Sequence, residues 1–168
     1  MTDEQRRPGP RPLTEAETSK LLAAGRFGVL ASLRRTGGPH LSTVAYHWLP
    51  ERGEILVSST ADRLKTRQLL ADGRAALHVR GPDEWSFAVA EGTVEVLGPT
   101  LEAGDAAGRE ILARTAEAAG AAGAPSTTEA DEAATLTELA ELAELAAERR
   151  VLFVLKVGRR YGTALDFG

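Results

Sequence analysis

The sequence predicts a mainly β fold, a small antiparallel barrel of six strands accompanied by helices. Five β-branched or aliphatic segments separated by turn residues are expected to form strands, at 27–34, 40–49, 54–60, 74–80 and 85–97. An alanine- and glutamate-rich segment over 101–150 predicts two added helices. The apolar run 151–157 then supplies the strand that closes the barrel.

Local signals predict the remaining elements. Thr14 and Glu17 form a capping box, which indicates a helix over 15–24. A second helix is expected over 61–71, directly after the third strand. The fifth strand is expected to bulge at Gly92, because a glycine inside a strand often marks such an irregularity.

The two added helices are expected over 101–119 and 131–149, joined by a flexible segment over 120–131. In the second helix leucine recurs every three residues and forms a broad apolar stripe. Such a stripe is typical of a helix that packs on the barrel or on a partner subunit. A coiled coil would need a sustained heptad, which the sequence lacks.

Composition limits the classes of function. A chain of 168 residues that is 43% hydrophobic and 26% charged predicts one soluble domain over 13–168, and the polar, proline-rich segment 1–12 predicts a disordered arm. We expect no membrane segment and no secretory signal, because the apolar runs are short and the N-terminus has no apolar centre. The absence of cysteine excludes disulfides and thiolate metal sites, which fits the expected cytoplasmic location. The net charge of −4 argues against a general affinity for nucleic acid.

The segment SSTADRLKTRQLL, over 58–70, carries cations where a helix begins, although a helix N-terminus already has positive partial charge. Those cations are Arg63, Lys65 and Arg67. The preceding strand ends in three hydroxyls, at Ser58, Ser59 and Thr60. Hydroxyls and free backbone N–H groups are neutral donors to an anion and the cations add charge, so the pattern predicts a local phosphate site. The alternative is a solvated helix whose start is capped by Thr60 and Asp62.

Three segments carry a resemblance to a known family: GRFGVLASLRRTGGPHLSTVAYHW, then ILVSSTADRLKTRQLLADGRAALHV, then FAVAEGTVEVL. In order and spacing they resemble flavin and deazaflavin oxidoreductases of the pyridoxamine 5'-phosphate oxidase-like split-barrel superfamily. The resemblance covers 15–98 well and 151–162 weakly. It implies a six-stranded antiparallel split β-barrel of the FMN-binding type, with the two helices added before the last strand.

The resemblance also implies where a cofactor binds. The strand-to-helix junction would hold the cofactor phosphate through Ser58, Ser59, Thr60, Arg63 and Lys65, with Arg67 or Gln68 as helpers. The strand STVAY would run beside the tricyclic ring, through Ser42, Thr43, Val44, Ala45 and Tyr46. Members are typically homodimers with two cofactors between the subunits, and Trp85, Phe87 or the C-terminal RRYG would reach across.

The implied activity is hydride transfer between reduced F420, or alternatively FMN, and a small organic acceptor, with the redox chemistry supplied by the cofactor. The alanine-, glycine- and arginine-rich composition and the added helices resemble the F420-dependent group. Tyr46, His47 and Tyr161 are candidates to donate a proton. Oxidation of vitamin B6 is not expected, because the C-terminal GRRYGTALDFG has no histidine to match that of the basic tail of the B6 oxidases.

Other functions remain open at this point. The chain can be a non-catalytic FMN- or F420-binding protein, or a cofactor-free interaction module that uses its alanine- and leucine-rich helices. A haem-handling protein would use His47 and His78, should their strands share a face. Two histidines without nearby carboxylates or cysteines are a poor metal signature, so no metal is expected.

Overall fold

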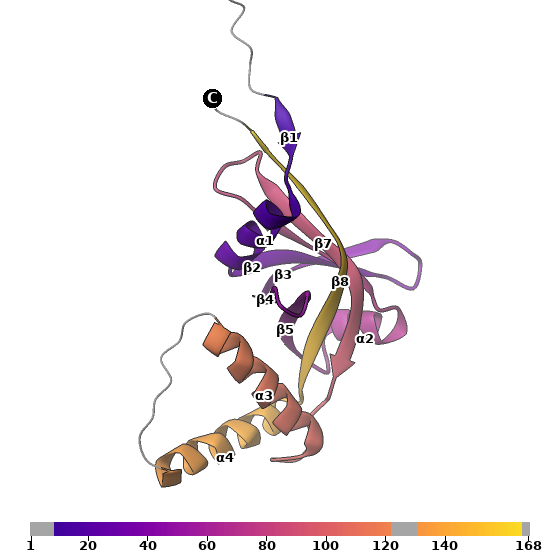
Figure 1. Cartoon of the computed structure of the whole chain (residues 1–168). Helices are drawn as coiled ribbons and strands as arrows, with labels where there is room; N and C mark the ends of the chain where they lie inside the picture. The colour runs from indigo at the N-terminus through magenta and orange to yellow at the C-terminus, as the bar shows by residue number, and fades with distance from the viewer. Residues whose placement is uncertain (1–8, 122–130, 166–168) are drawn as a thin grey trace, which may run out of the picture.

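The computed structural model describes residues 9–121 and 131–165 and shows an antiparallel sheet with four helices among them (Figure 1). The elements in chain order are β1 (Pro10–Pro12), α1 (Glu15–Ala24), β2 (Phe27–Leu33), β3 (Pro39–Ala45), β4 (His47–Leu49), β5 (Glu54–Thr60), α2 (Leu64–Ala71), β6 (Arg74–Arg80), β7 (Phe87–Leu97), α3 (Ala106–Ala121), α4 (Asp131–Ala147) and β8 (Arg150–Leu165). The sheet order is β3-β2-β6-β7-β8-β5-β4, and β1 pairs with β8. The predicted fold class, a mainly β split barrel with helices added before the last strand, is confirmed.

The described residues contain eight strands where six were expected. One extra strand arises because Tyr46 interrupts the predicted strand 40–49 and separates β3 from β4. The Tyr46 backbone N–H donates to the Arg26 carbonyl at 3.0 Å, and its hydroxyl donates to the Leu22 carbonyl at 2.6 Å. Tyr46 is therefore bonded to α1 and to the connection between α1 and β2 rather than to a neighbouring strand.

The second extra strand lies in the predicted disordered arm over 1–12. Pro10–Pro12 form β1, which pairs antiparallel with the end of β8, from Thr163 to Leu165. The arm prediction is therefore wrong for these residues, and residues 1–8 lie outside the described part of the chain. The pairing was missed because proline is rare inside strands and is tolerated at an edge, where no N–H is needed.

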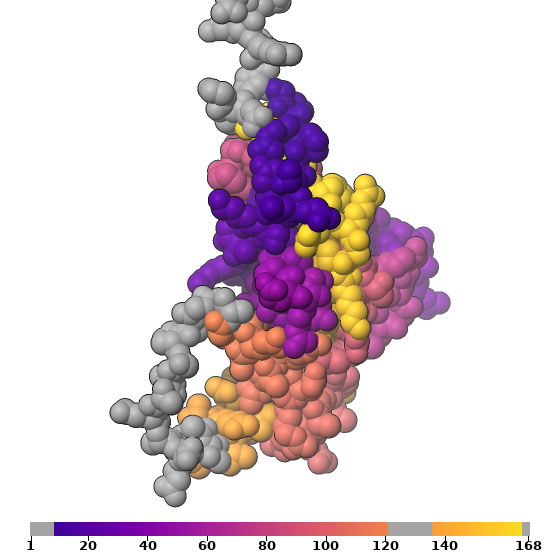
Figure 2. Space-filling view, in the orientation of Figure 1, coloured from indigo at the N-terminus to yellow at the C-terminus, as the bar shows by residue number. Residues whose placement is uncertain are grey.

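Strand β8 spans Arg150–Leu165 and is therefore longer than the predicted 151–157. Its first half pairs with β5 and β7, and its second half pairs with β7 and β1. Figure 2 shows part of this strand, in yellow, at the surface beside the indigo N-terminal segment. The predicted bulge is confirmed, because the register between β7 and β8 shifts between Glu91 and Gly92.

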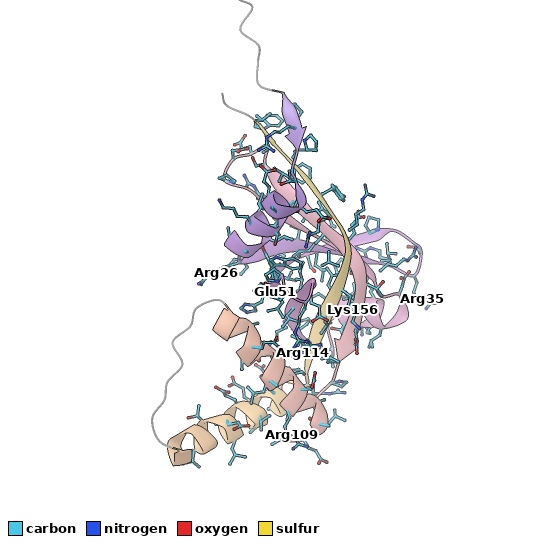
Figure 3. All side chains as sticks on the ribbon, in the orientation of Figure 1. Arg26, Arg35, Glu51, Arg109, Arg114 and Lys156 are labelled. Carbon is cyan, nitrogen blue, oxygen red and sulfur yellow. The ribbon has the colours of Figure 1, made fainter. Side chains whose placement is uncertain are left out.

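Apolar side chains pack on both faces of β5 and β8. One cluster fills the barrel, where α1 contributes Leu22 and α2 contributes Leu69. The other lies between the sheet and α3, where Ile111 and Ala118 meet Leu56 and Leu152. Arg114 of α3, labelled in Figure 3, forms an ion pair of 3.0 Å with Glu54 of β5. The added helices are thus attached to the outside of the barrel.

Helix α3 spans Ala106–Ala121 rather than 101–119, and α4 ends at Ala147 rather than at 149. Helix α3 begins at Ala106 rather than at 101, because the Asp105 carboxylate accepts from the Gly108 and Leu101 backbone N–H groups and ends the preceding loop. Most of the expected flexible segment 120–131 lies outside the described residues. In the leucine stripe of α4, Leu142 is buried while Leu136 and Leu139 are exposed. Within the described ranges no helix is both long and apolar enough to cross a membrane.

Candidate functional site at the junction of β5 and α2

The junction between β5 and α2 is a tight turn. The Thr66 hydroxyl donates to the Thr60 carbonyl at 2.8 Å, which ties the first turn of α2 to the end of β5. Arg63 occupies the N-cap position with extended φ and ψ of −68° and 143°, and no side chain caps the helix. The alternative in which Thr60 and Asp62 cap α2 is therefore wrong, because these two residues hydrogen-bond to each other. The first backbone N–H groups of α2 point out of the helix end without a side-chain cap.

One edge of β5 is unpaired close to this junction. Among the described strands, β4 pairs only with the first part of β5, Glu54–Leu56, and the rest of β5 pairs with β8 alone. Strand β3 pairs only with β2, yet it comes close to β5. The edge of β5 from Val57 to Thr60 that faces away from β8 is therefore unpaired among the described strands, and it leads to the start of α2. Unpaired backbone groups on such an edge are possible partners for a ligand.

Lys65 is a half-buried cation at the start of α2. Burial lowers the pKa of its ammonium, and the positive charge of Arg63 lowers that pKa further. Among the described residues, no carboxylate forms an ion pair with Lys65 or Arg63. Two neighbouring cations without a carboxylate partner destabilise each other, and a bound anion would relieve this cost.

The two arginines of the junction differ from Lys65 in their electrostatic environment. The Thr60 hydroxyl lowers the pKa of Asp62 most, and the charges of Arg63 and Arg67 lower it further. Asp62 thus balances part of the positive charge of both exposed arginines. We therefore place the half-buried Lys65 at the centre of the candidate anion site, with Arg63 beside it.

The three predicted hydroxyls of β5 do not converge. Alternation along the strand directs Ser59 to the same face as Ile55 and Val57 in the barrel, and Ser58 to the face covered by α3. The Ser58 hydroxyl accepts from the Arg150 guanidinium at 3.2 Å. The Thr60 hydroxyl donates a hydrogen bond to the Asp62 carboxylate. Of the three, Ser59 is therefore the one whose side chain lies on the barrel face of the junction.

The five predicted residues of the ring strand are divided between the two faces of the sheet. Ser42 and Val44 pair with Leu30 and Gly28 and share their inward face, whereas Thr43 and Ala45 lie on the exposed outer face. Tyr46 is 4% exposed and belongs to the core. The Ser42 hydroxyl oxygen is buried and has no hydrogen-bond partner in the described structure. An unpaired buried hydroxyl is costly, and a polar ligand atom would satisfy it.

The candidate proton donors and haem ligands are dispersed. The Tyr46 hydroxyl is committed to Leu22, and burial raises its pKa to about 12. His47 is on β4 and His78 is on β6, two strands that are not neighbours in the sheet. The His78 ring stacks on Phe87 with 5.3 Å between ring centroids. No group of three metal-ligating side chains was found in the described ranges.

Two features of the site region were not recognised from the sequence. Gln68, expected only as a helper at the phosphate, is buried, and its Oε1 accepts from the Ser32 hydroxyl at 2.8 Å and bonds His40 Nδ1 at 2.9 Å. A partial signal existed, because Gln68 follows Lys65 by three residues and so lies on the same helix face. The second feature is a cavity of about 430 Å³ between α3, α4 and the sheet, lined by residues that include Ser58, Leu112, Glu144 and Arg150. No signal in the sequence pointed to this cavity, because the segments that form α3 and α4 contain no recognisable motif.

These residues fit a cofactor with a phosphate and a flat ring. Lys65, Arg63 and the start of α2 provide the charge and the donors that a phosphate needs. Ser42 offers an unsatisfied hydroxyl on the neighbouring strand, and Thr43 and Ala45 offer an exposed surface. The donor set contains no thiol or carboxylate cluster that would favour a metal instead.

Comparison with solved structures supports the fold. An FAD-binding protein from Mesorhizobium loti has a TM-score of 0.60 and 21% identity, over 92% of this chain and 96% of that one. An F420 reductase has a TM-score of 0.55 and 20% identity, over 84% and 94%. A haem-binding protein from Mycobacterium smegmatis has a TM-score of 0.57 and 21% identity, over 91% of this chain and 58% of that one. At these identities the likeness establishes the architecture alone.

The sequence comparison establishes more. Residues 14–156 match the family described as pyridoxamine 5'-phosphate oxidase. This range begins at the cap of α1, contains the β5–α2 junction and ends within β8. Since the match covers most of the chain, the protein belongs to the pyridoxamine 5'-phosphate oxidase family, whose split-barrel fold the structure displays.

Proposed function

We propose that the protein is an oxidoreductase that binds F420, or alternatively FMN, and passes a hydride between the reduced cofactor and a small organic acceptor. The cofactor phosphate binds at the β5–α2 junction, and the ring lies along β3. Family membership and the similar FAD-binding and F420 reductase structures support a flavin-type cofactor. A B6 oxidase activity is not part of the proposal.

One observation carries the proposal: a half-buried lysine beside an arginine, with no carboxylate partner among the described residues, at the start of a helix. Ser42 of β3, a strand that comes close to β5, has an unsatisfied buried hydroxyl. A solvated surface helix would leave its cations exposed, whereas Lys65 is half-buried.

The cofactor, when bound, supplies the hydride chemistry. The residues of this chain bind and orient it: Lys65 and Arg63 hold the phosphate, and β3 fixes the plane of the ring. Holding the reactants close together and excluding water accounts for much of the rate enhancement available to such an enzyme. Tyr46 takes no part in proton transfer, because its buried hydroxyl already donates a hydrogen bond to the Leu22 carbonyl.

The proposed assembly is a homodimer with the cofactor between the subunits. The outer face of β2 and β3 is apolar, with Phe27 66% exposed and Leu41 62% exposed. Register places both on the face that also carries Thr43 and Ala45. A second copy that covers this face would bury the apolar side chains.

Cofactor titration with matched lysine variants tests the proposal. Lys65→Ala should weaken binding of F420 or FMN about 10- to 100-fold, the range expected for a lost charge-assisted hydrogen bond. Lys20→Ala, an exposed lysine on α1, is the control and should bind as wild type does. Fluorescence quenching of the cofactor gives both dissociation constants. Equal affinities for wild type and Lys65→Ala would contradict the proposed phosphate site.

Turnover and absorbance separate the alternatives. Oxidation of reduced F420 by added acceptors supports the reductase, whereas tight binding without turnover over a broad acceptor panel favours a non-catalytic binding protein. The similar haem-binding protein makes haem the second ligand to try. A Soret band after incubation with haemin, without binding of either flavin, would replace the proposal by haem handling.

A further inference from the structure

We infer that Gln68 is a positioning residue that sets the distance between the phosphate-binding helix α2 and the ring-binding strand β3. The inference rests on the proposed function. It extends that proposal by naming a residue that touches neither part of the cofactor and yet determines how well both parts are bound at once.

Gln68 joins three elements through one atom. Its Oε1 bonds Ser32 Oγ of β2 at 2.8 Å and His40 Nδ1 of β3 at 2.9 Å. Ser32 and His40 are direct partners in the β2–β3 ladder, so Gln68 bridges the turn end of this hairpin. Figure 1 shows α2 beside the turn between β2 and β3, and Figure 3 labels Arg35 at that turn.

The bridge is buried. Ser32 is 1% exposed and Gln68 is 8% exposed, so water competes little for these groups. An amide oxygen has two lone pairs, and here both are used, by the hydroxyl and by an imidazole N–H. Breaking the bridge would leave buried donors unpaired, which makes the arrangement of α2 against the hairpin stiff.

The two halves of the cofactor site extend from this bridge. Along α2, Lys65 precedes Gln68 by three residues, on the same helix face and about 4.5 Å away along the axis. Along β3, Ser42 follows His40 by two residues, on the same strand face and about 7 Å away. A shift of α2 against the hairpin would therefore change the separation of Lys65 from Ser42.

Ligands of different length sense this separation differently. Riboflavin can contact only the ring strand and inorganic phosphate only the helix, whereas FMN must contact both at once. Its affinity includes an advantage from linking the two parts, and this advantage requires that the two subsites be correctly spaced. The ratio of the riboflavin Kd to the FMN Kd measures how much the phosphate improves binding. Loss of the bridge should therefore lower this ratio, whereas the riboflavin Kd itself should change less.

The test measures this ratio in Gln68→Leu, which keeps the side-chain size and removes the acceptor. The same titrations with F420 and its phosphate-free deazaflavin core cover the other cofactor. We expect the ratio to fall about tenfold in Gln68→Leu. Leu70→Gln, an exposed change on the same helix, is the control and should leave the ratio unchanged.

A double-mutant cycle shows whether the effect passes through the bridge. Ser32→Ala in the wild-type background should lower the ratio by a smaller factor, because His40 still bonds Gln68. The same substitution in the Gln68→Leu background should have no further effect on the ratio. Should Gln68→Leu fail to fold, Ser32→Ala and His40→Phe provide the same measurement, and each should lower the ratio.

Three outcomes are decisive. If wild type binds FMN or F420 no better than its phosphate-free core, the proposed function fails and the inference fails with it. If wild type favours the phosphorylated cofactor and the bridge variants keep the same ratio, the inference alone is overturned. A fall in unfolding stability with an unchanged ratio would show that Gln68 has a purely structural role.

Discussion

At the scale of single residues, the cations of α2 were predictable from the sequence but their roles were not. Arg63, Lys65 and Arg67 are visible as a cluster, and the structure shows that they differ in burial and in partners. Arg63 and Arg67 are exposed and both near Asp62, whereas Lys65 is half-buried beside Arg63. Burial depends on what packs around the helix, and a sequence of one chain does not display that packing.

Tyr46 is the residue whose predicted role the structure most argues against. STVAY places it in the ring strand, yet its hydroxyl lies in the core and donates to Leu22 at 2.6 Å. Tyr46→Phe should lower the free energy of unfolding by about 1 kcal/mol, the usual value of one hydrogen bond. The loss is larger if no water molecule replaces the hydroxyl as the donor to the Leu22 carbonyl. Urea unfolding measures the first effect. Cofactor affinity should not change, and a large loss of affinity would return Tyr46 to the binding site.

The same residue predicts a pH dependence at alkaline pH. Burial raises the pKa of Tyr46 from the ordinary tyrosine value of 10.0 to about 12, so the unfolded chain loses this proton before the folded chain does. Its contribution to stability is therefore fully present below pH 10 and is lost as the pH rises toward 12. In Tyr46→Phe this part of the alkaline loss should be absent. The free energy of unfolding of both proteins, measured between pH 9 and 12, tests this. The same pH dependence in wild type and Tyr46→Phe would show that the hydroxyl is exposed.

At the scale of elements, the strands with regular alternation were predicted well and the irregular ones were not. Segments 27–34, 54–60 and 74–80 match β2, β5 and β6 to within a residue. The break at Tyr46, the pairing of β1 and the second half of β8 depend on contacts between distant residues. The bulge at Gly92 was predictable, because the position requires a residue without a side chain.

The bulge provides a test at this scale. A Cβ at Gly92 would lie 1.9 Å from the Lys156 carbonyl oxygen, so the long β7–β8 ladder would have to shift. Gly92→Ala should destabilise the protein by about 1–3 kcal/mol or more, measured as a lower unfolding midpoint. Gly158→Ala is the matched control on β8, where the nearest atom would be 4.0 Å away. Equal midpoints for the two variants would show that the bulge is not tightly packed.

At the scale of the whole molecule, the resemblance predicted the architecture, which is confirmed, and a place for the cofactor site, which stays a prediction. It did not reveal the unpaired edge of β5 or the bridge at Gln68, because both arise from how distant elements meet. The added helices cover the outside of the sheet and border a cavity of about 430 Å³. Their sequence of alanine, leucine and glutamate indicates helices and does not indicate what they enclose.

The proposed dimer makes a prediction at this scale. Leu41→Glu places a charge on the exposed apolar face of β3, and burial of that charge between two subunits would be costly. The variant should sediment as a monomer at concentrations where wild type is a dimer, and it should bind cofactor weakly. Leu101→Glu, equally exposed before α3, should remain dimeric. Sedimentation velocity of the three proteins measures their oligomeric states. A dimeric Leu41→Glu would show that the interface does not include this face of β3.

The central claim is that Lys65 at the β5–α2 junction holds the cofactor phosphate. A crystal structure of the protein with F420 or FMN tests it most directly. The account predicts a phosphate oxygen about 3 Å from the Lys65 ammonium, with the ring against β3. A cofactor bound elsewhere, with the Lys65 ammonium in bulk solvent, would contradict the account.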